Sequence, residues 1–185
     1  MKKFILSAFA LTLVVNLSAQ KYFSRDVVAR FNATTPSSPE LIEATSTSGS
    51  MVIDFATNTV QAAVLIKSFQ FQRALMQEHF NENYMESDKY PKANFKGDIV
   101  NTGVINLKKD GTYDAKLKGK LTLHGVSKEM ETTAKCTVKG KQILATANFE
   151  VQMADFKIDI PSLVSDKVAK SAKITISTAL ELLAN

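Results

Sequence analysis

The sequence is poor in the residues that carry most protein chemistry. Its 185 residues include one cysteine, two histidines and no tryptophan. One cysteine cannot form an internal disulfide, so the fold must be held by its hydrophobic core. Cys136 shares one side of an alternating stretch with Ala134 and Val138. That position predicts a buried, unreactive thiol, because a reactive one needs exposure and a positive setting.

The two histidines, His79 and His124, are too few and too far apart for the usual metal or catalytic motifs. A zinc site takes three or four ligands, often from a His-Glu-x-x-His or paired-cysteine pattern, and neither pattern occurs. The sequence also has no Gly-x-Ser-x-Gly nucleophile elbow, phosphate loop or dinucleotide fingerprint. We therefore predict a protein that is not an enzyme and uses no metal or cofactor.

Long apolar runs and strong charge are missing as well. The formal net charge is +5, and the excess is spread along the chain, which gives little support for nucleic-acid binding. The longest apolar run, residues 4–15, is too short to span a bilayer, so we predict no integral membrane segment.

The N-terminus has the three parts of a secretory signal peptide. Two lysines precede the apolar run, and small residues follow it up to Ala19. We predict that residues 1–19 are removed by cleavage after about Ala19. The remaining chain, 20–185, is then a single domain of a bacterial protein that is periplasmic or secreted.

Most of the mature chain alternates between apolar and polar residues. Alternation with period two predicts strands with one dry and one wet face, and an Asp-Gly pair at 110–111 predicts a hairpin turn. Eight or nine antiparallel strands are expected, at residues 27–31, 41–45, 51–55, 60–66, 94–100, 112–123, 128–138, 143–153 and 172–182. Two faces on nearly every strand indicate one sheet closed on itself or two packed sheets.

One segment follows a helical period instead. Between residues 73 and 85, Leu75, Met76, Phe80 and Tyr84 recur at short intervals with no Gly or Pro. This spacing predicts one short amphipathic helix, which could plug the barrel or cover its mouth.

The predicted inward faces are uncharged and contain many small residues. A barrel of about eight strands is either just filled by its side chains or holds one small ligand. Small residues near strand middles favour an apolar cavity, but they could also compensate for large neighbours in a tapering, filled barrel. The small inward residues are Ala62, Ala115, Gly119, Ala134, Ala145 and Ala147.

Four segments resemble the YceI-like family in the same order along the chain. The most specific is GKLTLHGVSK at 119–128, and SDKYPKANF at 87–95 is similar to a second family segment. DFKI at 155–158 resembles the family's DFGI, with Lys157 where the family usually has Gly. Residues 166–168 and 174–176 resemble the family's last segment, so the resemblance covers about residues 40–183.

This resemblance implies an all-β, extended antiparallel, lipocalin-like barrel that binds a polyisoprenoid or an isoprenoid quinone. We therefore expect an exported, non-catalytic binder or carrier of a long apolar amphiphile. The alternative is a filled barrel that acts in the cell envelope through protein contacts on its surface. The oligomeric state stays open, a homodimer included.

The residues expected to contact the ligand come from the strands, the helix and its flanks. Phe95, Tyr113, Leu121, Phe149 and Met153 would line the wall, and Phe71, Leu75, Met76, Phe80 and Tyr84 would cover the mouth. Tyr90, Arg73 or His124 would meet a polar head group. For His124, a structural role at a strand end before Gly125 is the other interpretation, with the ring fixing the turn.

Overall fold

Eleven antiparallel strands form one sheet that closes on itself in this computed structural model, which describes residues 21–183. The predicted signal peptide lies outside the described residues. The strands are β1 (Lys21–Ser24), β2 (Val28–Thr34), β3 (Glu43–Ser46), β4 (Gly49–Asp54), β5 (Thr59–Leu65), β6 (Gln70–Phe71), β7 (Lys92–Ile99), β8 (Gly111–Leu123), β9 (Val126–Lys139), β10 (Gln142–Gln152) and β11 (Val168–Leu182). The barrel predicted from the sequence is confirmed.

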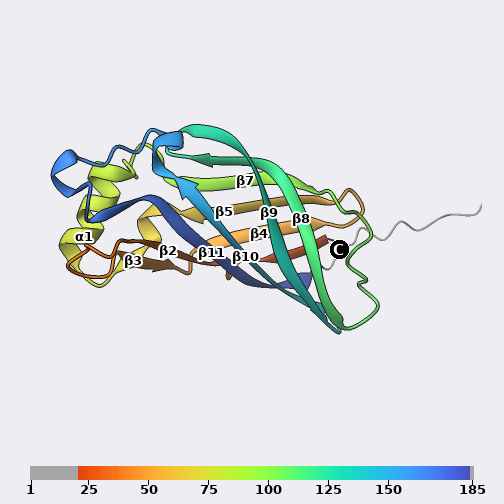
Figure 1. Ribbon diagram of the computed structural model, residues 1–185. Coiled ribbons are helices and arrows are strands. Elements are labelled where there is room, and N and C mark those ends of the chain that lie inside the picture. Colours follow the sequence, from red (N-terminus) through yellow and green to blue (C-terminus); the bar gives the residue numbers. More distant parts are fainter. Residues whose placement is uncertain (1–20, 184–185) are drawn as a thin grey trace, which may run out of the picture.

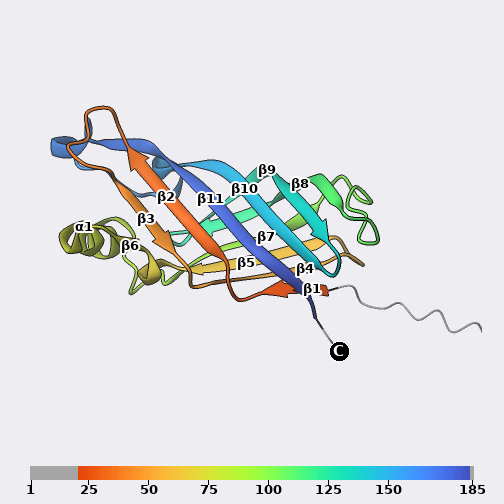
Figure 2. The same cartoon turned by 90° about the horizontal axis from the view of Figure 1, so that it is seen from below.

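The ring closes because the last strand pairs with the first. Its order is β1-β4-β5-β7-β8-β9-β10-β11, and β11 returns to β1 through the Tyr22–Leu182 pair. Strands β2, β3 and β6 continue the sheet from the other half of β11. Three of the long strands of the barrel are each interrupted once and so appear as two short strands: β1 with β2, β3 with β4, and β5 with β6. Counting each pair as one strand, the barrel has eight strands, which we call its walls (Figures 1 and 2).

The interruptions line up where the backbones come close together. A Cβ on Gly49 would lie 2.9 Å from the Cβ of Val27, so glycine leaves the space that the fully buried Val27 side chain fills. On the next wall, the hydroxyls of Ser46 and Ser68 lie 2.6 Å apart. A 3-10 turn at Ile66–Ser68 separates β5 from β6 at the same level.

The predicted helix lies between the early and late strands, across one end of the barrel (Figure 1). It consists of α1 (Ala74–His79) followed by one π-helical turn, Phe80–Tyr84. Phe80 is its buried anchor, with ring centroids 4.9 Å from Phe71 and 5.5 Å from Phe31. The aromatic contacts hold the helix against β2 and β6.

Candidate functional site: an apolar cavity in the barrel

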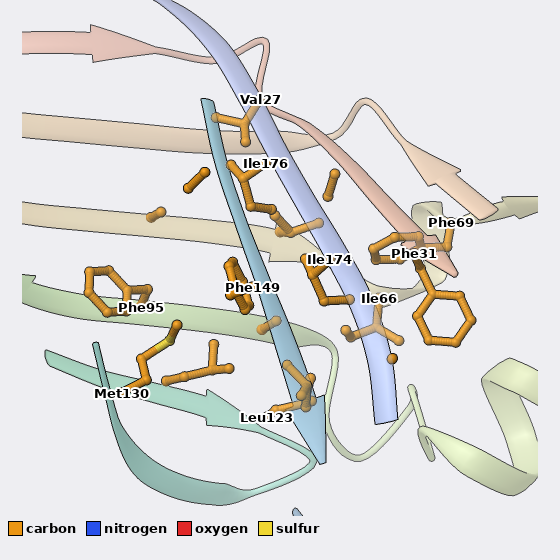
Figure 3. A pocket seen from close by; sticks show the side chains of 18 of the residues that line it. Val27, Phe31, Ile66, Phe69, Phe95, Leu123, Met130, Phe149, Ile174 and Ile176 are labelled. Carbon is orange, nitrogen blue, oxygen red and sulfur yellow. The ribbon is translucent and has the colours of Figure 1, made fainter. Parts of the chain in front are cut away.

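The interior of the barrel is hollow. A cavity of about 400 Å³ runs along it, within the roughly 300–1,000 Å³ of typical ligand pockets. Apolar side chains from nearly every wall point into it, among them Val27, Phe31, Phe95, Phe149 and Ile174 (Figure 3). A filled barrel, the alternative left open by the sequence, does not fit this space.

The small inward residues are what leave the space open. Ala62, Ala115, Ala134, Ala145 and Ala147 all line the cavity. They belong to four different strands, β5, β8, β9 and β10, and face the same interior. Alanine on several walls therefore creates room that larger aliphatic residues would fill.

Gly119 has a different role from the one predicted and does not line the cavity. It pairs with Gly97 across β7 and β8. A Cβ on Gly119 would lie 2.4 Å from the Cα of Gly97, so both glycines are needed for the two backbones to approach. The small residue here serves strand packing instead of cavity volume.

One end of the cavity is closed by tightly packed side chains. Tyr22, Val138, Ile143 and Leu180 are buried in the same hydrophobic cluster as the inner lining, but they do not line the cavity. Ile143 and Leu180 have no exposed surface, and Tyr22 packs edge-to-face on Phe55 with centroids 5.6 Å apart. A ligand tail would therefore end against this cluster.

The other end, which we call the open end, lies beneath the helix and two loops. Its lining includes exposed or half-buried residues: Pro39, Glu40, Met76, His79, Val164 and Lys167. Glu40 forms an ion pair with Arg73, the residue just before α1. Polar groups thus gather at this end while the deeper wall is almost wholly apolar, a polarity that suits an amphiphile with its head outward.

Eight of the twelve predicted contact residues line the cavity. They are Phe71, Met76, Phe80, Tyr84, Phe95, Leu121, Phe149 and Met153. Leu75, Tyr90, Tyr113 and His124 do not line it. Leu75 is 61% exposed on the outer side of α1, and the Tyr113 hydroxyl donates a hydrogen bond to the Lys109 carbonyl, 2.9 Å away.

His124 and Tyr90 contact each other beside the β8–β9 turn. Their ring centroids are 4.7 Å apart, edge to face. The imidazole Nδ1 lies 3.0 Å from the Phe156 carbonyl and Nε2 lies 2.9 Å from the Glu86 carboxylate. His124 itself has a φ of 49°, followed by Gly125 at 72°, so it occupies the turn and fixes it.

Sequence reasoning missed lining residues on strands, at a strand interruption and in loops. Ile174 and Ile176 of β11 lie on the inward side of a predicted strand, and the alternation could have identified them. Phe31 lies in the middle of β2, on the same face as Ala29 and Ala33, so the alternation could have identified it as well. Phe69 lies between the 3-10 turn and β6, where the strand is interrupted and the period is lost. Glu40 and Lys167 belong to loops that have no periodic signal.

The lining is almost wholly apolar and includes the single cysteine. Cys136 is buried and lines the cavity, as expected for an unreactive thiol, and burial raises its pKa to about 11. Across residues 21–183, no group of three or more His, Cys, Asp or Glu side chains is arranged to hold a metal ion. The same residues contain no helix with the length and apolar character to cross a bilayer.

Comparison with known proteins places these features in a family context. The sequence model of the YceI-like domain matches residues 14–180. The comparison with curated protein sequences found no match.

Three solved structures have a similar fold at low sequence identity. A polyisoprenoid binding domain from Saccharophagus degradans, implicated in plant cell wall breakdown, has a TM-score of 0.76 at 13% identity, covering 89% of this chain and 99% of that one. Burkholderia cenocepacia BcnA has a TM-score of 0.63 at 14% identity, covering 82% and 95%. A YceI protein from Campylobacter jejuni has a TM-score of 0.55 at 16% identity over the whole of both chains.

Proposed function

Because this chain belongs to the YceI-like family, we propose that it binds the hydrocarbon part of a lipid inside its barrel. The ligand is a polyisoprenoid or an isoprenoid quinone, held without chemical change. The observation that carries the proposal is the apolar cavity of about 400 Å³, closed at one end and open at the other. The similar fold of a polyisoprenoid binding domain supports the same ligand class.

The size of the cavity suits one chain. A carbon of liquid hydrocarbon takes up a volume close to that of a liquid water, about 30 Å³. A cavity of about 400 Å³ therefore holds at least on the order of a dozen carbons. Burial at about 0.8 kcal/mol per methylene gives about 10 kcal/mol, which has to offset an entropy cost of binding of about 4–15 kcal/mol.

The orientation of the ligand follows from the two ends. The tail would extend toward the cluster around Ile143 and Leu180, past Phe149 and Phe95. The head group would remain near His79 and Lys167, where the cavity is exposed to water. Tyr84, from the π-helical turn, offers a hydroxyl on the same side.

Export is part of the proposal and rests on residues 1–19. Their charge, apolar run and small residues before Gln20 are typical of a cleaved signal peptide. The protein would then hold its lipid in the periplasm or outside the cell. N-terminal sequencing of the protein recovered from a periplasmic or culture fraction should begin near Gln20, and an uncleaved cytoplasmic protein would contradict export.

Lipid binding is tested on the mature protein in two steps. Organic extraction followed by mass spectrometry should recover an isoprenoid lipid near one equivalent per chain. The stripped protein should then bind added geranylgeraniol in a saturable titration, and glycerol should not compete. Recovery of solvent alone, together with no binding of geranylgeraniol or a short-chain ubiquinone, would overturn the proposal.

A further inference from the structure

Three leucines project into solvent around the open end of the cavity. Leu41 is 55% exposed, Leu75 61% and Leu163 87%, the highest values among the large hydrophobic side chains of residues 21–183. They come from three separate segments: the β2–β3 loop, α1 and the turn before β11. Single exposed leucines are ordinary, but three from different segments at one opening need a reason.

Polar contacts bring the three segments together. The Arg73–Glu40 ion pair joins the start of α1 to the residue before Leu41. The Thr35 hydroxyl donates to the Asp166 carbonyl at 2.9 Å, and the Ser38 hydroxyl donates to the Lys167 carbonyl. The views in Figures 1 and 2 place α1, the β2–β3 loop and the 160–167 segment at the same end of the barrel.

The leucines are next to residues that line the cavity itself. Glu40, Met76 and Val164 each line the open end and each directly follows or precedes one of the three leucines. Each of the three exposed leucines is therefore the sequence neighbour of a residue at the entrance to the apolar interior.

The charges at this end are compatible with a lipid surface. The Arg73–Glu40 pair carries no net charge. Lys167 lines the opening, is exposed, and forms no ion pair with any described residue, so it is free to meet a lipid phosphate. The acidic residues Glu78 and Asp166 are also exposed, directly before His79 and Lys167 in the sequence. The contact with the lipid surface would therefore depend on the leucines and not on a net positive charge.

We infer that the open end docks on the surface of a lipid bilayer through Leu41, Leu75 and Leu163, so that the lipid passes directly between the membrane and the cavity. This rests on the proposed lipid-binding function. A partner protein or a second copy fits less well, because a stable interface uses about 20–30 residues a side and these are three separate projections. Apolar side chains that dip into the head-group region are the usual means of reversible attachment to a bilayer.

The test is flotation of the mature protein with phosphatidylcholine vesicles. The wild type should float with the vesicles. The triple variant Leu41→Ser, Leu75→Ser, Leu163→Ser should bind them about tenfold or more weakly, because each substitution removes apolar contact with the bilayer. A matched control is Val52→Ser, Val100→Ser, Leu144→Ser, which changes three exposed apolar residues of β4, the segment after β7, and β10. It should float like the wild type.

Binding of geranylgeraniol added from solution separates docking from lipid binding. All three proteins should bind it equally, because none of the changed residues lines the cavity. A wild type that binds geranylgeraniol but does not float, or a triple variant that floats normally, overturns the docking inference alone. A triple variant whose only change is loss of a dimer in sedimentation also overturns it, in favour of a second copy. A wild type that floats but binds no geranylgeraniol overturns the proposed function.

Discussion

The imidazole of His124 bridges Glu86 and Phe156, with Nε2 2.9 Å from the Glu86 carboxylate and Nδ1 3.0 Å from the Phe156 carbonyl. The bridge joins the β8–β9 turn to the end of the helical segment and to the loop after β10. Each ring nitrogen therefore lies within hydrogen-bond distance of one acceptor. His124 thus connects three segments beside the cavity without lining it.

Breaking this bridge should destabilise the fold more than the loss of one surface contact. His124→Asn keeps a residue that tolerates positive φ but is too short to reach both partners, and should lower the free energy of unfolding by about 1–3 kcal/mol. A double-mutant cycle with Glu86→Gln, measured by urea denaturation, should give a coupling energy of about 0.5 kcal/mol or more. Strictly additive effects would show that the two side chains do not act together.

The close approach of β7 and β8 makes Gly119 hard to replace. Its Cβ would lie 2.4 Å from the Lys96 carbonyl oxygen as well as from the Gly97 Cα, and backbone atoms cannot move aside easily. Gly119→Ala should cost about 1–3 kcal/mol of stability through overpacking. Gly111→Ala in the same strand is the control, because the atoms nearest to its Cβ would be those of the Tyr113 side chain, at 3.2 Å or more. Equal thermal stability of the two variants would contradict the close approach.

Lys157 occupies a turn position whose backbone conformation glycine would adopt with less strain. Its φ of 57° and ψ of 34° are left-handed, a conformation that costs a side-chain-bearing residue about 1–2 kcal/mol. Lys157→Gly should therefore raise the free energy of unfolding by about 0.5–1 kcal/mol after the extra flexibility of the unfolded chain is allowed for. Lys170→Gly, within β11, should instead lower the free energy of unfolding. Destabilisation by both changes would argue against a strained turn.

Stability at alkaline pH should depend on Cys136. Burial, with a smaller contribution from Asp114, raises the thiol pKa from 9.0 to about 11. Between these values the folded chain keeps a proton that the unfolded chain releases, so unfolding becomes easier as the pH rises, by up to about 3 kcal/mol. Cys136→Ala removes this contribution. Urea denaturation of both proteins from pH 8 to 11 should show that the free energy of unfolding falls more steeply with pH for the wild type than for the variant. The same pH dependence in the two proteins would contradict the raised pKa of Cys136.

The strands with a strong period could be predicted, and the interrupted ones only in part. Strands β8 to β11 alternate over eleven or more residues, so their inward faces follow directly from the sequence. β1 and β6 have four and two residues, too few to establish a period. Their places in the sheet are set by pairing with β4 and β3, which the sequence alone does not reveal.

The candidate site was predictable where it depends on strand faces and less so on the helix and loops. Leu75 and Met76 are neighbours on a helix, so their side chains point about 100° apart, and only Met76 faces the cavity. Tyr113 lies on the inward side of β8 but toward the closed end, where it packs against the cluster that contains Ile143 and Leu180. The backbone of Lys167 is held at the open end by one hydrogen bond from the Ser38 hydroxyl of the β2–β3 loop, a long-range contact that has no local signal.

The central claim is that the barrel encloses free space for a lipid tail, and Ala147→Phe tests it most directly. Ala147 lines the cavity on β10, whereas Leu144 of the same strand is exposed on the outside, so Leu144→Phe is the matched control. Filling the cavity should lower the affinity for geranylgeraniol by about tenfold or more while the protein stays folded, because free space avoids the roughly 1–3 kcal/mol cost of overpacking. The control should bind like the wild type. An Ala147→Phe protein that unfolds, or that binds geranylgeraniol as well as the wild type does, would contradict a lipid-holding cavity.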